Sequence, residues 1–252
     1  MENTKHITSC ANPEIKKFAE LKDKKGRETH GLFCVEGKRA LETFLSAGWQ
    51  CVQLIFTQDA YENFDLALRK NAPIMLVTES VVKKISTAVS PSGFMGIFEL
   101  PEKSPLCDLQ SGLVLYEIGD PGNMGTLIRS SVAFGAVCVV IGGCDVWSPK
   151  VIQASAGIIA YAHIIETNWQ DLMSAKRNLR TYALVASAGK KLEGVDLRDG
   201  LLVVGNEAHG IPESVARQCD DCVAIAMSGP AESLNAAVAG SIALYARHAR
   251  KS

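Results

Sequence analysis

The chain has 252 residues, of which 47% are hydrophobic and 21% are charged, and its 26 basic residues nearly balance its 27 acidic ones. This composition is typical of a folded globular protein and excludes a disordered chain, a collagen-like repeat and a disulfide scaffold. The longest nearly apolar run, 132–144, is shorter than the ~18 residues that a membrane span needs. The first residues lack the apolar stretch of a secretory signal, so we expect a cytoplasmic protein with its cysteines reduced and mostly in the core. Cys219 and Cys222 form the only close cysteine pair, and without a second pair at zinc-site spacing we expect no metal site.

Helical and strand-like patterns alternate between residues 12 and 100. The expected elements are, in order, a helix from Pro13, a strand over 32–35, a helix over 37–47 and strands over 52–56 and 74–77. This order predicts a small α/β domain. Within it, basic side chains outnumber acidic ones between residues 16 and 27, which is typical either of a nucleic-acid contact or of a solvated helix face. The basic residues are Lys16, Lys17, Lys22, Lys24, Lys25 and Arg27.

A stretch rich in proline and polar residues, 101–112, separates this domain from the rest of the chain. We therefore expect an N-terminal domain over 1–103, a linker over 104–111 and a second domain over 112–252. In the second domain, apolar runs predict strands over 113–118, 137–141, 181–186, 201–204 and 223–226, and a last helix over about 231–250. The alternation of strands and helices predicts an α/β fold with a mainly parallel sheet and helices on both faces.

Three of these strands end in loops rich in Gly, Asn, Glu, Ser and Pro, where open α/β sheets bind ligands, so we expect the loops to converge on one pocket. In the first loop, a helix is expected from about Met124, and Arg129 on it could hold a phosphate through two hydrogen bonds. The glycines of this loop follow a G-x-x-G-x-x-G spacing, which does not match the G-x-G-x-x-G of dinucleotide-binding folds. A nicotinamide or other Rossmann enzyme is therefore a disfavoured alternative.

Taken together, the three loops resemble the motifs of the SpoU (TrmH-type) family of RNA ribose 2′-O-methyltransferases, in the SPOUT superfamily. The matching residues are Asn123, Gly125 and Arg129 in the first motif, Gly205, Asn206, Glu207 and Gly210 in the second, and Ser233, Leu234 and Asn235 in the third. The stretches 148–150 and 154–157 resemble the family's segment between the first two motifs. Residues 33–37 resemble the ribosomal-protein-like RNA-binding domain that many members carry. One departure is Ala226, where the third motif more often has proline.

The resemblance implies a deep trefoil knot in the second domain, a homodimer, and S-adenosylmethionine (AdoMet) as cofactor. The implied cofactor contacts are Gly205, Asn206, Ile225, Met227 and Leu234. The implied catalytic residues are Asn123, Arg129, Glu207, Ser233 and Asn235. Because a guanidinium hardly ever loses its proton, we expect Arg129 to hold the RNA phosphate and stabilise the developing alkoxide while the other four orient the reactants; the proton acceptor stays open.

The resemblance also implies that the basic residues between 16 and 27 contact RNA phosphates. We expect the substrate to be ribosomal RNA, because the N-terminal domain resembles that of members that modify rRNA. The alternatives are the same reaction on tRNA and a catalytically silent RNA-binding factor with the same fold.

Overall fold

The computed structural model describes residues 4–65 and 67–249 and divides the chain into two compact units. The N-terminal unit runs to Pro101 and also includes Asp145–Ala160, here called segment 145–160; the C-terminal unit consists of Glu102–Cys144 and the chain from Tyr161 onward. The chain therefore passes between the units three times. The two units are not consecutive stretches of sequence, unlike the two domains expected from the sequence. The expected linker over 104–111 lies just beyond the first of these crossings, at the start of the C-terminal unit.

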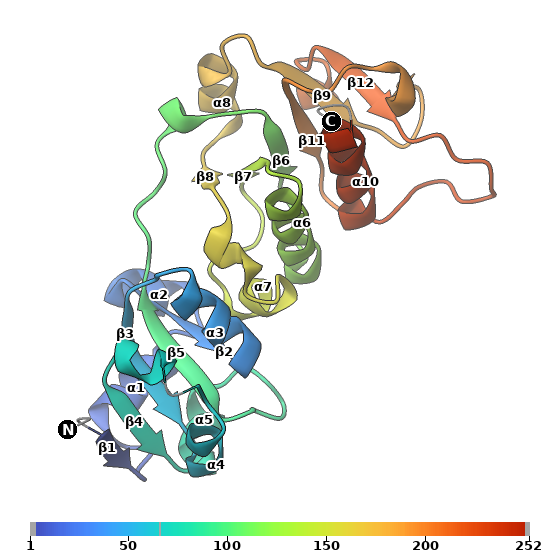
Figure 1. Cartoon of the computed structure of the whole chain (residues 1–252). Helices are drawn as coiled ribbons and strands as arrows, with labels where there is room; N and C mark the ends of the chain where they lie inside the picture. Colours follow the sequence, from blue (N-terminus) through green and yellow to red (C-terminus); the bar gives the residue numbers. More distant parts are fainter. Residues whose placement is uncertain (1–3, 66, 250–252) are drawn as a thin grey trace. The chain divides into compact units, whose positions relative to one another are not determined.

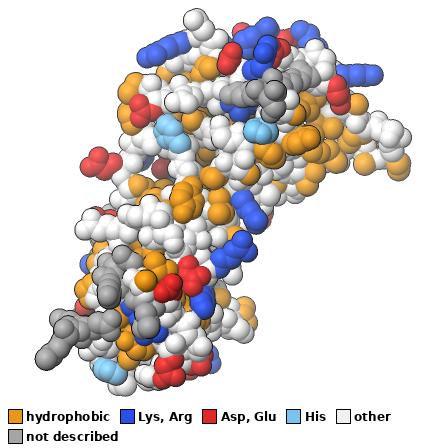
Figure 2. Space-filling model, in the orientation of Figure 1, with side chains coloured by type: hydrophobic (Ala, Val, Ile, Leu, Met, Phe, Trp, Pro, Cys, Tyr) orange, Lys and Arg blue, Asp and Glu red, His pale blue; other side chains and the backbone are white. Residues whose placement is uncertain are grey.

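The surface of both units carries charges of both signs, as Figure 2 shows for one face of the molecule. This mixture agrees with the net charge of −1. In the described part of the chain, no helix is both long and apolar enough to cross a membrane.

The N-terminal unit is built on a mixed sheet of five strands in the order β1-β4-β3-β5-β2 (Figure 1). Strands β1, β4 and β3 run parallel, and β5 pairs antiparallel with both β3 and β2. The strands are β1 (Thr4–Ile7), β2 (Leu32–Glu36), β3 (Cys51–Phe56), β4 (Ile74–Val77) and β5 (Phe94–Glu99). The helices are α1 (Pro13–Glu20), α2 (Lys24–His30), α3 (Lys38–Ser46), α4 (Gln58–Glu62), η1 (Leu68–Asn71) and α5 (Glu79–Ile85). The five predicted elements occur in the predicted order, whereas β1, β5 and the helices α2, α4 and α5 were not predicted.

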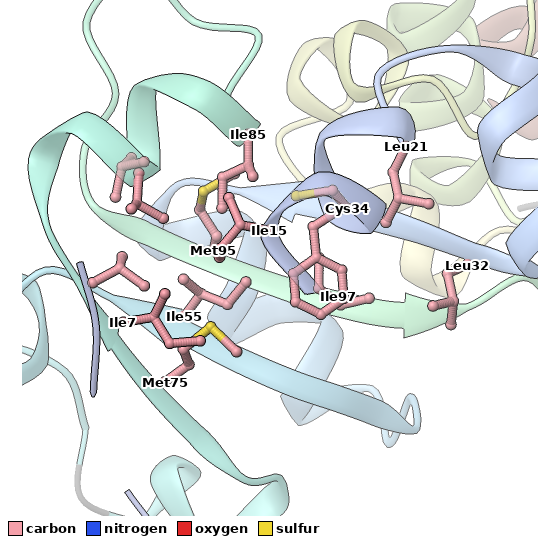
Figure 3. Close-up of a cluster of buried hydrophobic side chains, with 14 residues drawn as sticks. Ile7, Ile15, Leu21, Leu32, Cys34, Ile55, Met75, Ile85, Met95 and Ile97 are labelled. Atoms are coloured by element: carbon pink, nitrogen blue, oxygen red, sulfur yellow. The ribbon is translucent and has the colours of Figure 1, made fainter. Parts of the chain in front are cut away.

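Each face of this sheet has its own core. On one face, α1 and α5 bury an aliphatic cluster that includes Ile15, Met75 and Ile97 (Figure 3). On the other face, Phe33 of β2 lies among aromatic rings, and one of these is Trp147 of segment 145–160. The helix that follows Trp147, α7 (Pro149–Ala154), packs against β2. Segment 145–160 is therefore part of the packing of the N-terminal unit.

The C-terminal unit holds a sheet of seven strands in the order β10-β12-β9-β11-β6-β7-β8, and every pairing in it is parallel. The strands are β6 (Gly112–Tyr116), β7 (Val137–Ile141), β8 (Ile164–Glu166), β9 (Arg180–Leu184), β10 (Lys190–Lys191), β11 (Gly200–Val204) and β12 (Asp221–Ala224). Helices α6 (Pro121–Ala133) and α10 (Ala236–Ala249) pack on one face, whereas α8 (Trp169–Ala175) and α9 (Glu213–Ala216) bury side chains against the other. Short 3-10 turns are η2 (Leu106–Asp108), η3 (Ile158–Tyr161) and η4 (Leu192–Gly194). The predicted α/β architecture, with a parallel sheet covered on both faces, is confirmed.

Two helix boundaries differ from the sequence prediction, both because a side chain caps the helix. Helix α6 begins at Pro121 rather than near Met124, because the Asp120 carboxylate accepts the Asn123 N–H at 2.8 Å and proline occupies the first turn. Helix α10 begins at Ala236 rather than Ala231, because the Asn235 amide oxygen accepts the N–H groups of the following turn. The predicted end of that helix at residue 250 lies outside the described residues.

The prediction that the cysteines lie mostly in the core is wrong for most of them. Of the eight cysteines in the described residues, only Cys34, Cys51 and Cys138 are buried. Burial raises the pKa of Cys138 to about 12, so this thiol stays protonated and acts as a small apolar side chain. Cys107 is exposed because it lies in a short turn of the polar stretch before β6.

Candidate active site

The loops that carry the three motifs follow β6, β11 and β12, which belong to one parallel sheet. Parallel strands place their carboxyl ends at the same edge, so these loops come together there. Hydrogen bonds join these loops to one another. The expectation that the three loops converge is confirmed.

Glu207, in the loop after β11, holds the loop after β6. Its carboxylate accepts hydrogen bonds from the backbone N–H groups of Gly119 and Asp120, at 3.1 and 3.2 Å, and from the Asn123 side-chain amide at 2.9 Å. Partial burial acts to raise the pKa of Glu207, but these hydrogen bonds outweigh it and hold the pKa below its ordinary value. Glu207 is thus an ionised acceptor whose oxygens already have donors.

Two asparagines extend this network to the remaining loop and to the end of β6. The Asn235 side-chain amide donates to the Asn123 amide oxygen at 3.0 Å, so the start of α10 is tied to the start of α6. The Asn206 side-chain amide donates to the Glu117 carbonyl at 2.8 Å, while its oxygen accepts the N–H groups of Ala208 and His209. We call Asn123, Asn206, Glu207 and Asn235 the three-loop network.

Glu117 has a left-handed backbone, with φ of +53°. This conformation costs a residue other than glycine about 1 kcal/mol or more. Its N–H donates to the Ile141 carbonyl of β7 at 2.8 Å, and its carbonyl accepts the Asn206 amide. The strained turn is therefore fixed on both sides, and it directs the chain from β6 into the first-motif loop.

A pocket of about 470 Å³ opens beside the network. All five residues predicted to contact the cofactor line it: Gly205, Asn206, Ile225, Met227 and Leu234. Three of the predicted catalytic residues, Glu207, Ser233 and Asn235, line it as well. Gly205 is required by packing, because a Cβ there would lie 2.3 Å from the carbonyl carbon of Gly210. Pockets of this size, with apolar walls and a few polar groups, are typical of sites for small molecules and cofactors.

One wall of the pocket was missed by the sequence analysis. It comes from the end of β9 and from η4, and its residues are Leu184, Val185, Ala186 and Leu192. The predicted strand over 181–186 could have indicated it, because β9 lies between β11 and β12 in the sheet. The loop after this strand carries no recognisable motif, so only the strand order places it at the site.

Arg129 lies on α6, six residues after Asn123, and does not line the pocket. Its side chain is exposed, and among residues 4–65 and 67–249 its guanidinium has no hydrogen bond or ion pair. Ser233 also lies exposed, in the loop that leads to α10. Of the five predicted catalytic residues, the structure thus joins Asn123, Glu207 and Asn235 by hydrogen bonds, and it leaves Arg129 and Ser233 available to other groups.

The predicted RNA-contacting residues divide by exposure. Lys16, Lys17, Lys24 and Lys25 are exposed, and Lys22 is half-buried. Arg27 is only 3% exposed, and its guanidinium binds Asp145 and two backbone carbonyls. The assignment of Arg27 to the RNA-contacting surface is therefore wrong, because its charge is already neutralised inside the N-terminal unit.

The fold and the pocket at the carboxyl edge define an α/β enzyme with a small-molecule site. The model of the SpoU rRNA Methylase family matches residues 110–245, and the model of the MRM3-like substrate binding domain matches residues 12–96. The first match covers more than half of the chain, which therefore belongs to the SpoU rRNA methylase family. The predicted identity as a SpoU-family RNA methyltransferase is confirmed.

Similar proteins extend over almost the whole chain. An uncharacterized tRNA/rRNA methyltransferase of Synechocystis sp. is 29% identical over 95% of this chain and 92% of its own length. The 23S rRNA (guanosine(2553)-2′-O)-methyltransferase RlmP of Bacillus subtilis is 25% identical over 96% of this chain and 98% of its own length. The crystal structure of an AdoMet-bound rRNA methyltransferase from Sinorhizobium meliloti superposes with a TM-score of 0.86 at 28% identity, over 98% of both chains. The similarity therefore includes the N-terminal unit as well as the methyltransferase fold.

Proposed function

We propose that this protein transfers a methyl group from AdoMet to a ribose 2′-hydroxyl of ribosomal RNA. The observation that carries the proposal is the three-loop network beside the pocket, because it brings the residues of all three motifs to one site. The names of the relatives support the substrate class, since one of them acts on a ribose of 23S rRNA. We further propose that the N-terminal unit binds RNA and that the C-terminal unit is the methyltransferase unit, which folds as a trefoil knot.

The pocket fits AdoMet in size and chemistry. Leu184, Val204 and Ile225 provide apolar lining, and the lining residues between 205 and 210 provide polar backbone groups, around a volume of about 470 Å³. The absence of a side chain at Gly205 lets the backbone of Gly210 approach closely, which shapes this part of the lining. When bound, the cofactor supplies a methyl group activated by a sulfonium; the new C–O bond forms as the C–S bond breaks.

Arg129 is the residue we propose to act on the RNA. A ribose hydroxyl is a poor nucleophile, so its oxygen must be oriented and the charge that develops on it must be stabilised. An exposed guanidinium that has no hydrogen bond or ion pair within the described residues can hold the neighbouring phosphate through two hydrogen bonds and stabilise this charge. Glu207 is a poor base, because three donors stabilise its ionised form. The hydroxyl proton therefore leaves to an acceptor outside the three-loop network.

We propose that the exposed lysines of α1 and α2 contact RNA phosphates, with Arg27 removed from this set. Replacing Lys16, Lys17 and Lys24 by glutamine removes three such contacts and should lower the slope of log affinity against log salt by about 2 to 3. RNA binding measured over a salt series tests this, with AdoMet affinity as the control. An unchanged slope would return these lysines to the role of a solvated helix face.

A homodimer is supported by an apolar stripe on α10. Val238, Ile242 and Tyr245 recur at helical spacing and are 48%, 37% and 60% exposed. Figure 2 shows hydrophobic side chains gathered over the region where Figure 1 draws α10 and the loop before it. Exposed apolar side chains in register on one helix are typical of an interface. Ile242→Asp should shift the protein toward monomers in sedimentation equilibrium, and an unchanged mass would count against this surface.

The test of the reaction is transfer of labelled methyl groups. The full chain is incubated with methyl-labelled AdoMet and, separately, with unmodified rRNA and tRNA transcripts, and the RNA is digested to nucleosides. Label in a 2′-O-methylnucleoside from rRNA alone supports the proposal, whereas label from tRNA alone supports the alternative substrate. AdoMet binding without transfer to either RNA contradicts the proposed substrates, and absence of AdoMet binding favours a catalytically silent RNA-binding protein.

A cytoplasmic location stays a prediction.

A further inference from the structure

Segment 145–160 is fixed to the N-terminal unit by a buried ion pair. Arg27 of α2 donates from Nε to Asp145 Oδ2 at 3.0 Å and also from a terminal nitrogen, and its other terminal nitrogen donates to the carbonyls of Leu21 and Lys22. The second carboxylate oxygen of Asp145 accepts the backbone N–H of Trp147 at 3.1 Å. Asp145 therefore anchors the segment and shapes the turn that presents Trp147.

Packing fixes the rest of the segment. The Trp147 ring lies 5.2 Å from Phe33 and 5.4 Å from Trp49, measured between ring centroids. The Trp49 indole N–H donates to the Ala160 carbonyl at 2.9 Å, close to the point where the segment ends. Gly157 has φ of +80°, and a Cβ there would lie 2.7 Å from the Ala40 Cα of α3. The segment thus fits one surface closely from its first residue to its last.

The residues just before the segment are attached to the first-motif loop. The Cys144 N–H donates to the Ile118 carbonyl at 2.8 Å. Gly143 has φ of +82°, and a Cβ there would lie 2.2 Å from the same carbonyl oxygen, so the two chain segments are in close contact. Ile118 directly precedes Gly119, whose N–H binds Glu207.

We propose that segment 145–160 couples the N-terminal unit to the first-motif loop, so that Arg27 and Asp145 are positioning residues for methyl transfer. This inference rests on the proposed function. Each link is a hydrogen bond or a covalent bond: Arg27 to Asp145, along the chain to Cys144, across to Ile118, and along the chain to Gly119 and Glu207. RNA that binds the N-terminal unit and changes the position of α2 would in this way act on the loop that holds Asn123.

Two properties make this path suited to such coupling. The Arg27–Asp145 pair is buried, with side chains that are 4% and 19% exposed, so water competes weakly with it. The glycines before the segment cannot accept larger side chains, and the strained Glu117 lies against Gly142, whose Cβ would be 3.4 Å from its Cγ. A displacement of Asp145 is therefore passed on through the close contact between Gly143 and Ile118, whose side chain is buried.

The experiment compares three variants of the full chain with the wild type. Asp145→Asn turns an amide group toward the buried guanidinium, and Gly157→Ala presses the segment away from α3. Trp49→Phe removes the indole hydrogen bond to Ala160 and part of the ring contact with Trp147. The matched control is Gly194→Ala, because a Cβ at Gly194 meets open space. The measurements are the single-turnover rate of methyl transfer at saturating rRNA and AdoMet, the affinities for both, and hydrogen exchange of residues 117–123 with and without RNA.

We expect Asp145→Asn and Gly157→Ala to lower the saturated rate by about 2- to 30-fold, with Trp49→Phe affected less and AdoMet affinity unchanged. We also expect RNA to slow hydrogen exchange in residues 117–123 of the wild type, and to do so less in Asp145→Asn even when RNA is bound. Wild-type rates together with wild-type exchange in all three variants would overturn the proposal and leave the segment a purely structural role. If the wild type methylates none of the RNAs, the proposed function fails, and the exchange measurement with bound RNA still decides whether the coupling exists.

Discussion

Glu207→Gln removes one of the two carboxylate oxygens that accept hydrogen bonds in the three-loop network. The carboxylate accepts the N–H groups of Gly119 and Asp120 and the side-chain amide of Asn123. A glutamine has one acceptor oxygen. When this oxygen takes the place of Oε1, it still accepts the Asp120 N–H and the Asn123 amide. The glutamine NH₂ group then faces the N–H of Gly119, which has lost its acceptor.

The cost follows from this count of hydrogen bonds. One charge-assisted bond is lost, and one N–H faces another donor at a partly solvated site, which together cost about 1–2 kcal/mol. Because tenfold in rate corresponds to about 1.4 kcal/mol, we expect kcat for methyl transfer to fall about 5- to 30-fold. The assay is single-turnover transfer to saturating RNA, with AdoMet affinity measured in parallel.

Glu213→Gln is the matched control. Glu213 lies exposed on α9 and pairs with Arg217 one turn away, so its loss should leave kcat unchanged. A Glu207→Gln protein that is folded and has the wild-type kcat would refute the argument that the carboxylate holds the loops for catalysis.

The pH dependence of the rate gives a second test of the same carboxylate. Partial burial acts to raise the pKa of Glu207, but the hydrogen bonds lower it overall, so the ionised form persists below the ordinary glutamate pKa. Its contribution is present above that ordinary value and is lost as the pH falls through the lowered pKa. We therefore expect an acid limb in the wild-type rate that Glu207→Gln lacks.

Arg129→Lys should keep AdoMet affinity and lower methyl transfer by on the order of 100-fold, since a lysine cannot form the paired hydrogen bonds to a phosphate; full activity would count against this role. Gly240→Ala should lower the free energy of unfolding by about 1–3 kcal/mol in thermal unfolding, because its Cβ would lie 2.4 Å from a packed leucine of α6. Gly194→Ala is its control, and equal melting temperatures would contradict the close packing of α10 on α6. The Lys176 ammonium, as the main cause, lowers the pKa of Asp220 to about 2. The ionised Asp220 carboxylate therefore stabilises the fold above about pH 4, and this contribution is lost as the pH falls to about 2. In Asp220→Asn, stability followed by circular dichroism should depend less on pH over this range.

Much of the site follows from the sequence because it depends on local rules. Apolar strands predict the parallel sheet, and the carboxyl ends of parallel strands must share an edge. Polar residues directly after such strands therefore meet, as Asn123 and Glu207 do. The wall formed by Leu184 and Val185 escaped prediction because the order of strands in a sheet is set by long-range packing.

The packing of segment 145–160 could not be predicted for the same physical reason. Asp145 and Arg27 are 118 residues apart, and nothing in either local sequence indicates the other. Arg27 also lies in a basic run, where charge alone cannot distinguish an exposed lysine from a buried, paired arginine. The early boundary predicted for α10 has a local cause: Asn235 caps the helix, but Glu232 and Ser233 just before it are residue types that also favour the start of a helix.

The three-loop network also limits how this protein can change over evolutionary time. Asn123 binds both Glu207 and Asn235, so each of these side chains satisfies a donor or acceptor of another. A substitution at one position leaves the partner without its hydrogen bond, and a second substitution elsewhere in the network then costs less than the first. Related chains should therefore retain these three residues together or lose them together. A descendant that has lost only one of them is expected to be on the way to losing the enzymatic activity.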